Sequence, residues 1–347
     1  MTVPTAALER AVAVLDSHPL VDGHNDLPWA LRQAAVIANL EQVEFVHQLV
    51  ARNPTTLGLA LSADEIQAVF ASGRIASLLG AEGGHSIGCS MGTLRSLYRL
   101  GVRYMTLTHN DNVAWADSAT DEPRLNGLSQ FGREVVLEMN RLGMLVDLSH
   151  VSPDTMNAAL DTSEAPVIFS HSSARALVDH VRNVPDSVLS RLPDNGGVCM
   201  VTFVPDFVST DCFAWSTELG RAMAGAGLEP KSWAARMTFA PEFAKSHPRP
   251  RATIAQVADH VEHVREVAGI GGVGIGGDYD GCDAMPVDLE DVTGYPRFLA
   301  ELMERGWSED ETAALAGGNV IRALREAESA ARRVQKERGP ALVRFTE

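Results

Sequence analysis

Short apolar runs alternate with helix-like segments along most of this 347-residue chain. The helix-like segments begin at capping residues such as Ser62 and Ser129, and they stop at glycines such as Gly73 and Gly143. Alternating strands and helices indicate parallel strands joined by right-handed crossovers. Because the runs are almost continuously apolar, we expect strands that are covered on both faces. The sequence therefore predicts an α/β fold.

Most of the predicted strands end in a residue that can bind a metal ion or transfer a proton. Strands are expected at residues 19–24, 75–82, 104–109, 144–150, 166–171, 197–204 and 272–278. Functional side chains at many carboxyl strand ends are typical of a TIM-like (β/α)8 barrel, whose catalytic face they form. A doubly wound sheet is the alternative, but it would gather its ligand at one switch point. The TIM-like barrel of the metal-dependent hydrolase type is the favoured fold.

One barrel strand is missing from this pattern. Seven strands can be recognised where a barrel of this type has eight, and the gap lies between His24 and Ile75. Residues 30–61 contain no clear strand. We expect one catalytic domain over residues 1–347, with an irregular insertion at about 205–250 and helices towards the C-terminus. An irregular stretch of that length is more typical of a functional insertion or lid than of a simple connection.

Composition excludes several classes of partner and location. Hydrophobic residues make up 45% of the chain and charged residues 21%, which permits a large core. The net charge of −16 argues against nucleic acid or an anionic membrane as the main partner. No signal peptide is visible, and no apolar run has the roughly 18–20 residues of a membrane helix. We therefore expect a cytoplasmic protein without a membrane anchor, whose four scattered cysteines are free thiols.

The candidate site residues follow the strand ends. His24 and Asp26 form a His-x-Asp pair, and side chains two residues apart on a strand point to the same side. Glu82 stands between an apolar strand and two glycines, where burying a carboxylate is costly without a cation or hydrogen-bond donors. Taken singly, a histidine at a strand end is more often structural, and an aspartate after glycines can be a turn residue. Their joint occurrence favours a metal site made from His24, Asp26, Glu82, His109, His150, His171 and Asp278.

This set is larger than one tetrahedral zinc ion requires. It suits two ions about 3.5–4 Å apart that share a bridging carboxylate. Some two-metal hydrolases use a carboxylated lysine as the bridge, but Lys231, Lys245 and Lys336 all lie away from the strand ends. Glu82 is therefore the expected bridge. The glycine pairs of the chain fit no nucleotide-binding motif, and no G-x-S-x-G elbow is present for a serine nucleophile.

With these residues assembled, the chain resembles the membrane (renal-type) dipeptidase family of zinc peptidases, including its soluble bacterial-type members. The resemblance covers roughly residues 15–325 and implies a TIM-barrel hydrolase, usually a homodimer, with two Zn²⁺ ions. The matching stretches, in family order, are Asp22-Gly-His-Asn-Asp-Leu-Pro-Trp29, Glu82-Gly-Gly-His-Ser86, Tyr104-Met-Thr-Leu-Thr-His109, Leu148-Ser-His-Val-Ser152, Val167-Ile-Phe-Ser-His-Ser-Ser173, Arg182-Asn-Val-Pro-Asp186 and Gly276-Gly-Asp-Tyr-Asp-Gly281.

The resemblance also implies the role of each metal ligand. His24 and Asp26 would hold one zinc ion, His150 and His171 would hold the other, and Glu82 would bridge both. A hydroxide between two such ions would be the nucleophile, because each ion acidifies the water bound to it.

The remaining roles implied by the resemblance concern the substrate. His109 would contact the substrate and the developing oxyanion, Arg182 would pair with the substrate carboxylate, and Asp278 would transfer the proton. A two-pronged contact from Arg182 favours a carboxylate one residue beyond the scissile bond, hence dipeptides, L,D-dipeptides included.

One departure from the family pattern coincides with the missing strand. Family members carry a second-strand segment of the type Gly-x-x-Gly-Gln-Phe-Trp-Ser, which this chain lacks; the pattern resumes with a helix-like stretch near residues 41–53. The expected function is that of a zinc-dependent dipeptidase. The alternatives are a related metal-dependent hydrolase of another amide, such as a lactam or an N-acyl amino acid, and a catalytically impaired homologue.

Overall fold

Six parallel strands form the central sheet of the molecule. The structure, a computed structural model, describes residues 4–26 and 39–346. The strands lie side by side in the order in which they occur along the chain, and every pairing is parallel, as predicted. They are β3 (Leu79–Glu82), β4 (Val102–Thr106), β5 (Leu145–Asp147), β6 (Val167–Phe169), β7 (Val198–Val201) and β8 (Val273–Ile275).

The first predicted strand is shorter than expected. Residues 19–24 join the edge of β8 through an isolated parallel bridge between Asp22 and Ile275, not through a regular strand. Gly23 donates its N–H to the Ile275 carbonyl at 2.9 Å, so this segment still extends the sheet beyond β8. The result is the expected α/β, TIM-like arrangement, with the carboxyl ends of the strands at one face.

No described strand joins the segment around Asp22 to β3, at the opposite edge of the sheet. Residues 27–38 belong to the gap between His24 and Ile75 and lie outside the described residues. They include residues 27–29, the end of the first stretch that matches the family pattern. The prediction of no strand over residues 30–61 was wrong in one detail: β1 (Leu57–Leu59) pairs with β2 (Ile75–Ser77) in a separate two-stranded sheet. A strand of three residues with a central glycine has too little pattern to be recognised.

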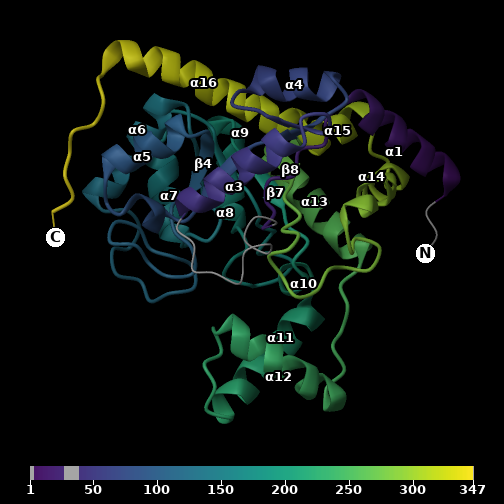
Figure 1. Cartoon of the computed structure of the whole chain (residues 1–347). Coiled ribbons are helices and arrows are strands. Elements are labelled where there is room, and N and C mark those ends of the chain that lie inside the picture. The colour runs from purple at the N-terminus through teal and green to yellow at the C-terminus, as the bar shows by residue number, and fades with distance from the viewer. Residues whose placement is uncertain (1–3, 27–38, 347) are drawn as a thin grey trace.

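Helices cover the outside of the sheet (Figure 1). Ser129 caps α6 by accepting the N–H of Gly132, and Gly143 ends that helix in the left-handed conformation with φ 83°, both as predicted. The helices before the insertion are α1 (Thr5–Ser17), α3 (Asn39–Arg52), α4 (Ala63–Ala71), α5 (Met91–Arg99), α6 (Gln130–Leu142), α7 (Pro153–Thr162), α8 (Asp186–Leu189) and α9 (Leu192–Asn195). The expected C-terminal helices are α13 (Ile254–Ala268), α14 (Tyr295–Glu304), α15 (Glu309–Ala313) and α16 (Asn319–Glu337).

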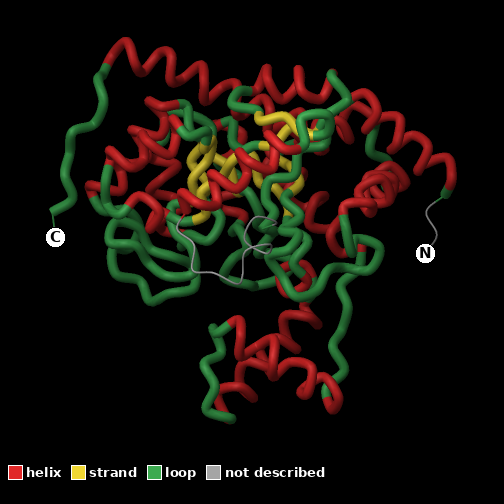
Figure 2. Tube along the Cα trace, viewed as in Figure 1, coloured by secondary structure: helices red, strands yellow, loops and turns green. Residues whose placement is uncertain are grey.

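Residues 205–250, expected to be irregular, are largely helical. They form α10 (Pro205–Val208), α11 (Thr210–Gly225) and α12 (Trp233–Ser246), and the last two protrude from the body of the molecule (Figure 2). Trp215, Leu219 and Met223 of α11 form a small core of their own with residues of α12. Prolines obscured two of these helices, α10 and α12, in the sequence. Pro205 occupies a first turn, where its missing N–H costs little, whereas Pro241 is tolerated inside α12.

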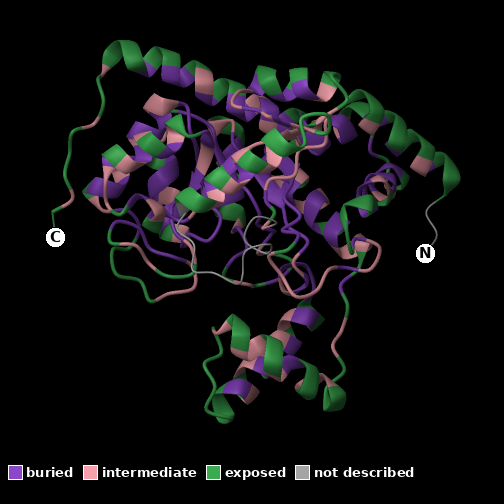
Figure 3. Cartoon of the chain, in the orientation of Figure 1, coloured by how far each residue is buried: buried purple, intermediate pink, exposed green. Residues whose placement is uncertain are grey.

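The main core lies between the sheet and its surrounding helices, where Figure 3 shows continuous burial. Phe169, Phe203 and Phe298 are among its fully buried side chains. All four cysteines are free, as predicted. None of the helices in the described part of the chain is both long and apolar enough to cross a membrane.

Candidate active site

The strand ends bring the seven predicted metal and proton-transfer residues together. Ligand atoms lie within 4.8 Å of one another in three overlapping groups. The groups are His24 with Glu82 and His171; Glu82 with His109 and His150; and His24 with Asp26 and Asp278. Because Glu82 and His24 each belong to two groups, the seven residues form one continuous cluster.

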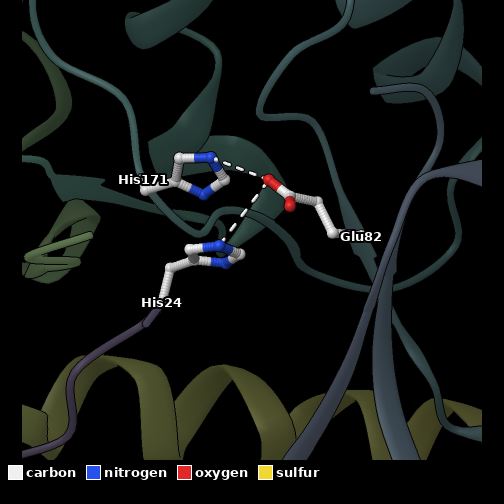
Figure 4. A group of neighbouring side chains, drawn as sticks. All are labelled: His24, Glu82 and His171. Atoms are coloured by element: carbon white, nitrogen blue, oxygen red, sulfur yellow. Dashed lines mark ion pairs between the residues drawn. The ribbon is translucent and has the colours of Figure 1, made fainter. Parts of the chain in front are cut away.

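Glu82 lies at the centre of this cluster. Its Oε1 is 2.9 Å from Nε2 of His150, 3.3 Å from Nε2 of His171 and 3.6 Å from Nε2 of His24. Figure 4 shows the last two of these contacts. Its Oε2 faces Nε2 of His109 at 3.7 Å. Glu82 thus faces all four histidines of the cluster through its two carboxylate oxygens.

Local backbone geometry sets these side chains in place. Glu82 is the last residue of β3, and the chain then turns through Gly83 with φ 113°. A Cβ on Gly84 would lie 2.4 Å from the Leu107 carbonyl oxygen, so only glycine lets the turn pack against the end of β4. His150 and Asp278 have φ of 68° and 60°, in the left-handed region that non-glycine residues rarely adopt. Such positions cluster at functional sites, where the surrounding structure compensates for their strain.

The second half of the cluster surrounds His24. Its Nε2 is 3.6 Å from Oδ1 of Asp26 and 3.9 Å from Oδ1 of Asp278, both beyond hydrogen-bond distance. This buried nitrogen has no hydrogen-bond partner among the described residues. A buried imidazole nitrogen that faces carboxylates without bonding to them fits a divalent cation, because the cation would satisfy all of these groups together.

Burial controls the protonation of His150 and His171, the other two buried histidines of the cluster. It lowers the pKa of His150 to about 3 and holds the pKa of His171 well below its ordinary value, so both are neutral near neutral pH. Burial alone would raise the pKa of Glu82, but the neighbouring histidines more than offset it, and the pKa lies well below its ordinary value. Neutral imidazoles around a carboxylate are the forms that bind metal ions.

The His24 half of the cluster attracts positive charge. Burial would lower the pKa of His24, yet Tyr104 and Glu82 outweigh it and raise the pKa well above its ordinary value. Burial raises the pKa of Asp278 to about 7, although His24 opposes the shift. Both residues therefore keep a proton to higher pH than they would in water.

Arg182 lies beside the cluster as a buried cation. Its Nη2 donates to the His171 carbonyl at 3.4 Å, its guanidinium lies 5.2 Å from the Phe207 ring centroid, and its Nε has no partner among the described residues. Burial lowers the pKa of Arg182 to about 10, so the side chain remains charged near neutral pH. Within the described part of the chain, none of the ion pairs includes Arg182, which leaves it suited to an anion. His109 is more open, with its side chain 41% exposed.

Three residues around the cluster, the partly buried Tyr104 and the fully buried Asp147 and Ser170, received no role from the sequence. Tyr104 places its hydroxyl 3.0 Å from Nδ1 of His24, while Asp147 and Ser170 lie behind His171. One of them, Asp147, could have been noticed in the sequence, because a carboxylate inside an apolar run is unusual unless several hydrogen-bond donors surround it.

Comparison with known proteins agrees with this arrangement. The family model of the membrane dipeptidases, peptidase family M19, matches residues 32–338. "Dipeptidase tcpJ" of Claviceps purpurea is 42% identical over 310 residues, which are 89% of this chain and 64% of that protein. "Uncharacterized dipeptidase C3A11.10c" of Schizosaccharomyces pombe is 40% identical over 314 residues, 89% of this chain and 68% of that protein. The chain thus spans about two thirds of the length of these relatives.

Solved structures share the fold. The probable dipeptidase PvdM of Pseudomonas aeruginosa has a TM-score of 0.75 and 26% identity, over 84% of this chain and 78% of that one. A metallopeptidase of Rhodobacter sphaeroides, solved with a phosphinate mimic of the dipeptide L-Ala-D-Ala, has a TM-score of 0.68 and 22% identity, over 83% and 74% of the two chains. At that identity the second likeness concerns the fold alone. With the family model matched over most of its length, the chain belongs to the membrane dipeptidase family, peptidase family M19.

Proposed function

We propose that this protein is a zinc-dependent dipeptidase that hydrolyses the peptide bond of small dipeptides, L,D-dipeptides included. The observation that carries the proposal is the pairing of a metal-type cluster with the buried, unpaired cation of Arg182. Family membership and the dipeptidase names of the relatives support the reaction class. L,D-dipeptides are included in the proposal because the Rhodobacter sphaeroides protein, which shares the fold, was solved with a mimic of L-Ala-D-Ala.

Two Zn²⁺ ions would be held by the two halves of the cluster. His24 and Asp26 would bind one ion, His150 and His171 the other, and Glu82 both. When bound, such ions acidify a water molecule and polarise the carbonyl group of the scissile bond.

The remaining side chains would manage protons and developing charge. Asp278 is buried and has a pKa of about 7, which suits a group that accepts a proton from water and returns it to the leaving amine. His109 would donate a hydrogen bond to the substrate oxygen, because its side chain is accessible and close to the centre of the cluster.

Arg182 would set the length of the substrate. The guanidinium of Arg182 donates to the backbone carbonyl of His171. A substrate carboxylate paired with Arg182 would therefore lie close to the proposed metal ligands. A dipeptide places its carboxylate one residue beyond the scissile bond, whereas a longer peptide would have to place a further residue in the same space. The homodimer and the cytoplasmic location stay predictions.

A related amide hydrolase is the second candidate. The gap between the segment around Asp22 and β3 in the described residues could widen the rim for a lactam or an N-acyl amino acid. An N-acyl amino acid, or a lactam that bears a carboxylate, would still pair with Arg182, so the metal cluster alone does not separate the candidates. A substrate panel does.

The test is hydrolysis of L,L- and L,D-dipeptides, a lactam and an N-acyl amino acid by purified, zinc-loaded protein. We expect turnover of dipeptides, and a loss of about 10²–10⁴-fold in Asp278→Asn, the size of a general acid–base contribution. Asp280→Asn is the matched control, because Asp280 is exposed and shares the positive φ of Asp278. Folded, zinc-loaded protein that cleaves only the other amides would move the assignment to the second candidate. Zinc binding without any turnover would identify an impaired homologue.

A further inference from the structure

A buried carboxylate lies behind the metal cluster, at the end of β5. Asp147 is fully buried, and its Oδ1 accepts the backbone N–H groups of Ser149 at 3.1 Å and Ser170 at 2.8 Å. Its Oδ2 accepts the hydroxyl groups of Thr106 and Ser170, both at 2.6 Å. All four partners donate, so each carboxylate oxygen has a defined set of donors.

The Ser170 hydroxyl has a second contact, which leads to the cluster. Its Oγ lies 2.8 Å from Nδ1 of His171. Because a hydroxyl carries one proton and Ser170 gives that proton to Asp147, its Oγ must accept the proton on Nδ1. The His171 tautomer with a proton on Nδ1 leaves Nε2 unprotonated, 3.0 Å from Nε2 of His150. Nε2 of His171 is also the atom facing Glu82 at 3.3 Å.

We infer that Asp147 and Ser170 are positioning residues that fix the tautomer and ring orientation of His171 as a metal ligand. The inference rests on the proposed function, because it takes His171 to be a ligand. The neighbouring ligand candidate differs: Nδ1 of His150 has no partner among the described residues. Among the described residues, His171 thus has a side-chain partner at Nδ1, whereas His150 has none. Groups that orient a ligand in this way commonly change metal affinity about 10–100-fold when removed.

An isosteric substitution would reverse the direction of this hydrogen-bond chain. In Asp147→Asn, the amide oxygen must face the two backbone N–H groups, so the NH₂ group must face the hydroxyls of Thr106 and Ser170. The Ser170 hydroxyl would then accept from Asn and donate to Nδ1 of His171. That change would place the histidine proton on Nε2, where it blocks the metal.

A double-mutant cycle separates this mechanism from a merely structural role. Ser170→Ala removes the hydroxyl but keeps the backbone N–H that bonds Asp147. If Asp147 acts on His171 through Ser170, then Asp147→Asn should lower zinc affinity strongly alone and add nothing in the Ser170→Ala background. Ser173→Ala is the matched control, since Ser173 is equally buried and its hydroxyl donates to the Thr202 carbonyl, at 3.5 Å, and to no cluster residue among those described.

The experiment is a competition titration of each protein against a zinc-binding chromophore, with unfolding of the metal-free proteins as a fold control. We expect affinity for one of the two ions to fall about 10–100-fold in Ser170→Ala, at least as far in Asp147→Asn, and not at all in Ser173→Ala. Unchanged affinity in Ser170→Ala, or an Asp147→Asn effect that is the same with and without the hydroxyl, would overturn the inference. Wild-type protein that binds no zinc would instead refute the proposed function.

Discussion

At the scale of single residues, burial decides which side chains can act. His150 and His171 are neutral because they are desolvated, and Asp278 holds its proton to about pH 7 for the same reason. Arg182 keeps its charge in spite of burial, since a guanidinium loses its proton only at high pH. Two neutral imidazoles thus lie near the charged guanidinium of Arg182, which has no ion pair among the described residues.

The cation gives a prediction about substrate recognition. Arg182→Gln should lower kcat/KM for dipeptides about 100-fold, because losing one partner of a buried charge pair costs about 3 kcal/mol. A dipeptide amide has no carboxylate, so its hydrolysis should change far less. Steady-state kinetics on the two substrates check this result.

Arg175→Gln is the control for that measurement, because Arg175 pairs with the exposed Asp179 at the surface. An equal loss of activity on the acid and amide substrates would contradict the assigned role of Arg182.

Candidate site residues could be predicted from the sequence only where a local pattern marks them. His24, Glu82 and Asp278 could be predicted, because each interrupts an apolar run where a barrel strand ends. Asp147 and Ser170 could not be given a role, because their partners come from three different strands and depend on which oxygen faces which donor.

At the scale of elements, Gly276 lets the backbone after β8 lie directly against the backbone after β6. A Cβ on Gly276, just after β8, would lie 1.8 Å from the Ser170 carbonyl oxygen. The backbones after the two strands are therefore in direct contact, and this contact keeps the Ser170–His171 segment next to the Asp278 segment.

Gly276→Ala should reduce the free energy of unfolding by about 3 kcal/mol, since overpacking against backbone has no flexible side chain to absorb it. Thermal or urea unfolding measures the effect. Gly271→Ala is the matched control, because a Cβ there meets nothing within 4 Å. Equal stability of the two variants would show that the contact is not as tight as described.

Helices and strands differed in how well their sequences predicted them. The ends of α6 were predictable because a serine cap and a left-handed glycine mark them locally. The helices α11 and α12 were not, because aromatic residues obscure the periodicity of both and Pro241 lies inside α12. The first strand was overestimated because its apolar pattern extends further than its single backbone bridge to β8.

At the scale of the whole molecule, the C-terminal tail is fastened to the body by Glu138 of α6. This carboxylate accepts from Arg95 of α5, from Arg141 and from the backbone N–H of Ala341. Burial would raise the pKa of Glu138, but the hydrogen bonds from Arg141, Ala341 and Arg95 more than offset it and lower the pKa. The charged form is therefore favoured in the folded protein.

This linkage predicts a pH-dependent difference in stability. A carboxyl group whose folded pKa is depressed stabilises the protein above its unfolded pKa of about 4.3, and the contribution is lost as the pH falls through the folded value. Glu138→Gln should cost about 2 kcal/mol at pH 7, because it leaves the partly buried Arg95 and Arg141 without a charged partner. The difference from wild type should shrink below about pH 4. Urea unfolding at both pH values tests this, and a difference that does not vary with pH would contradict it.

The cluster at the strand ends joins residues as far apart in the sequence as His24 and Asp278, so the whole fold is needed to assemble it. The most direct test of the proposed two-metal centre is the number of zinc ions bound per chain in the wild type and in Glu82→Gln. Elemental analysis after dialysis measures this number. We predict two ions in the wild type and loss of both in Glu82→Gln, because Glu82 contacts histidines of both halves. A wild type that binds fewer than two ions, or a Glu82→Gln protein that keeps both, would contradict a two-metal centre bridged by Glu82.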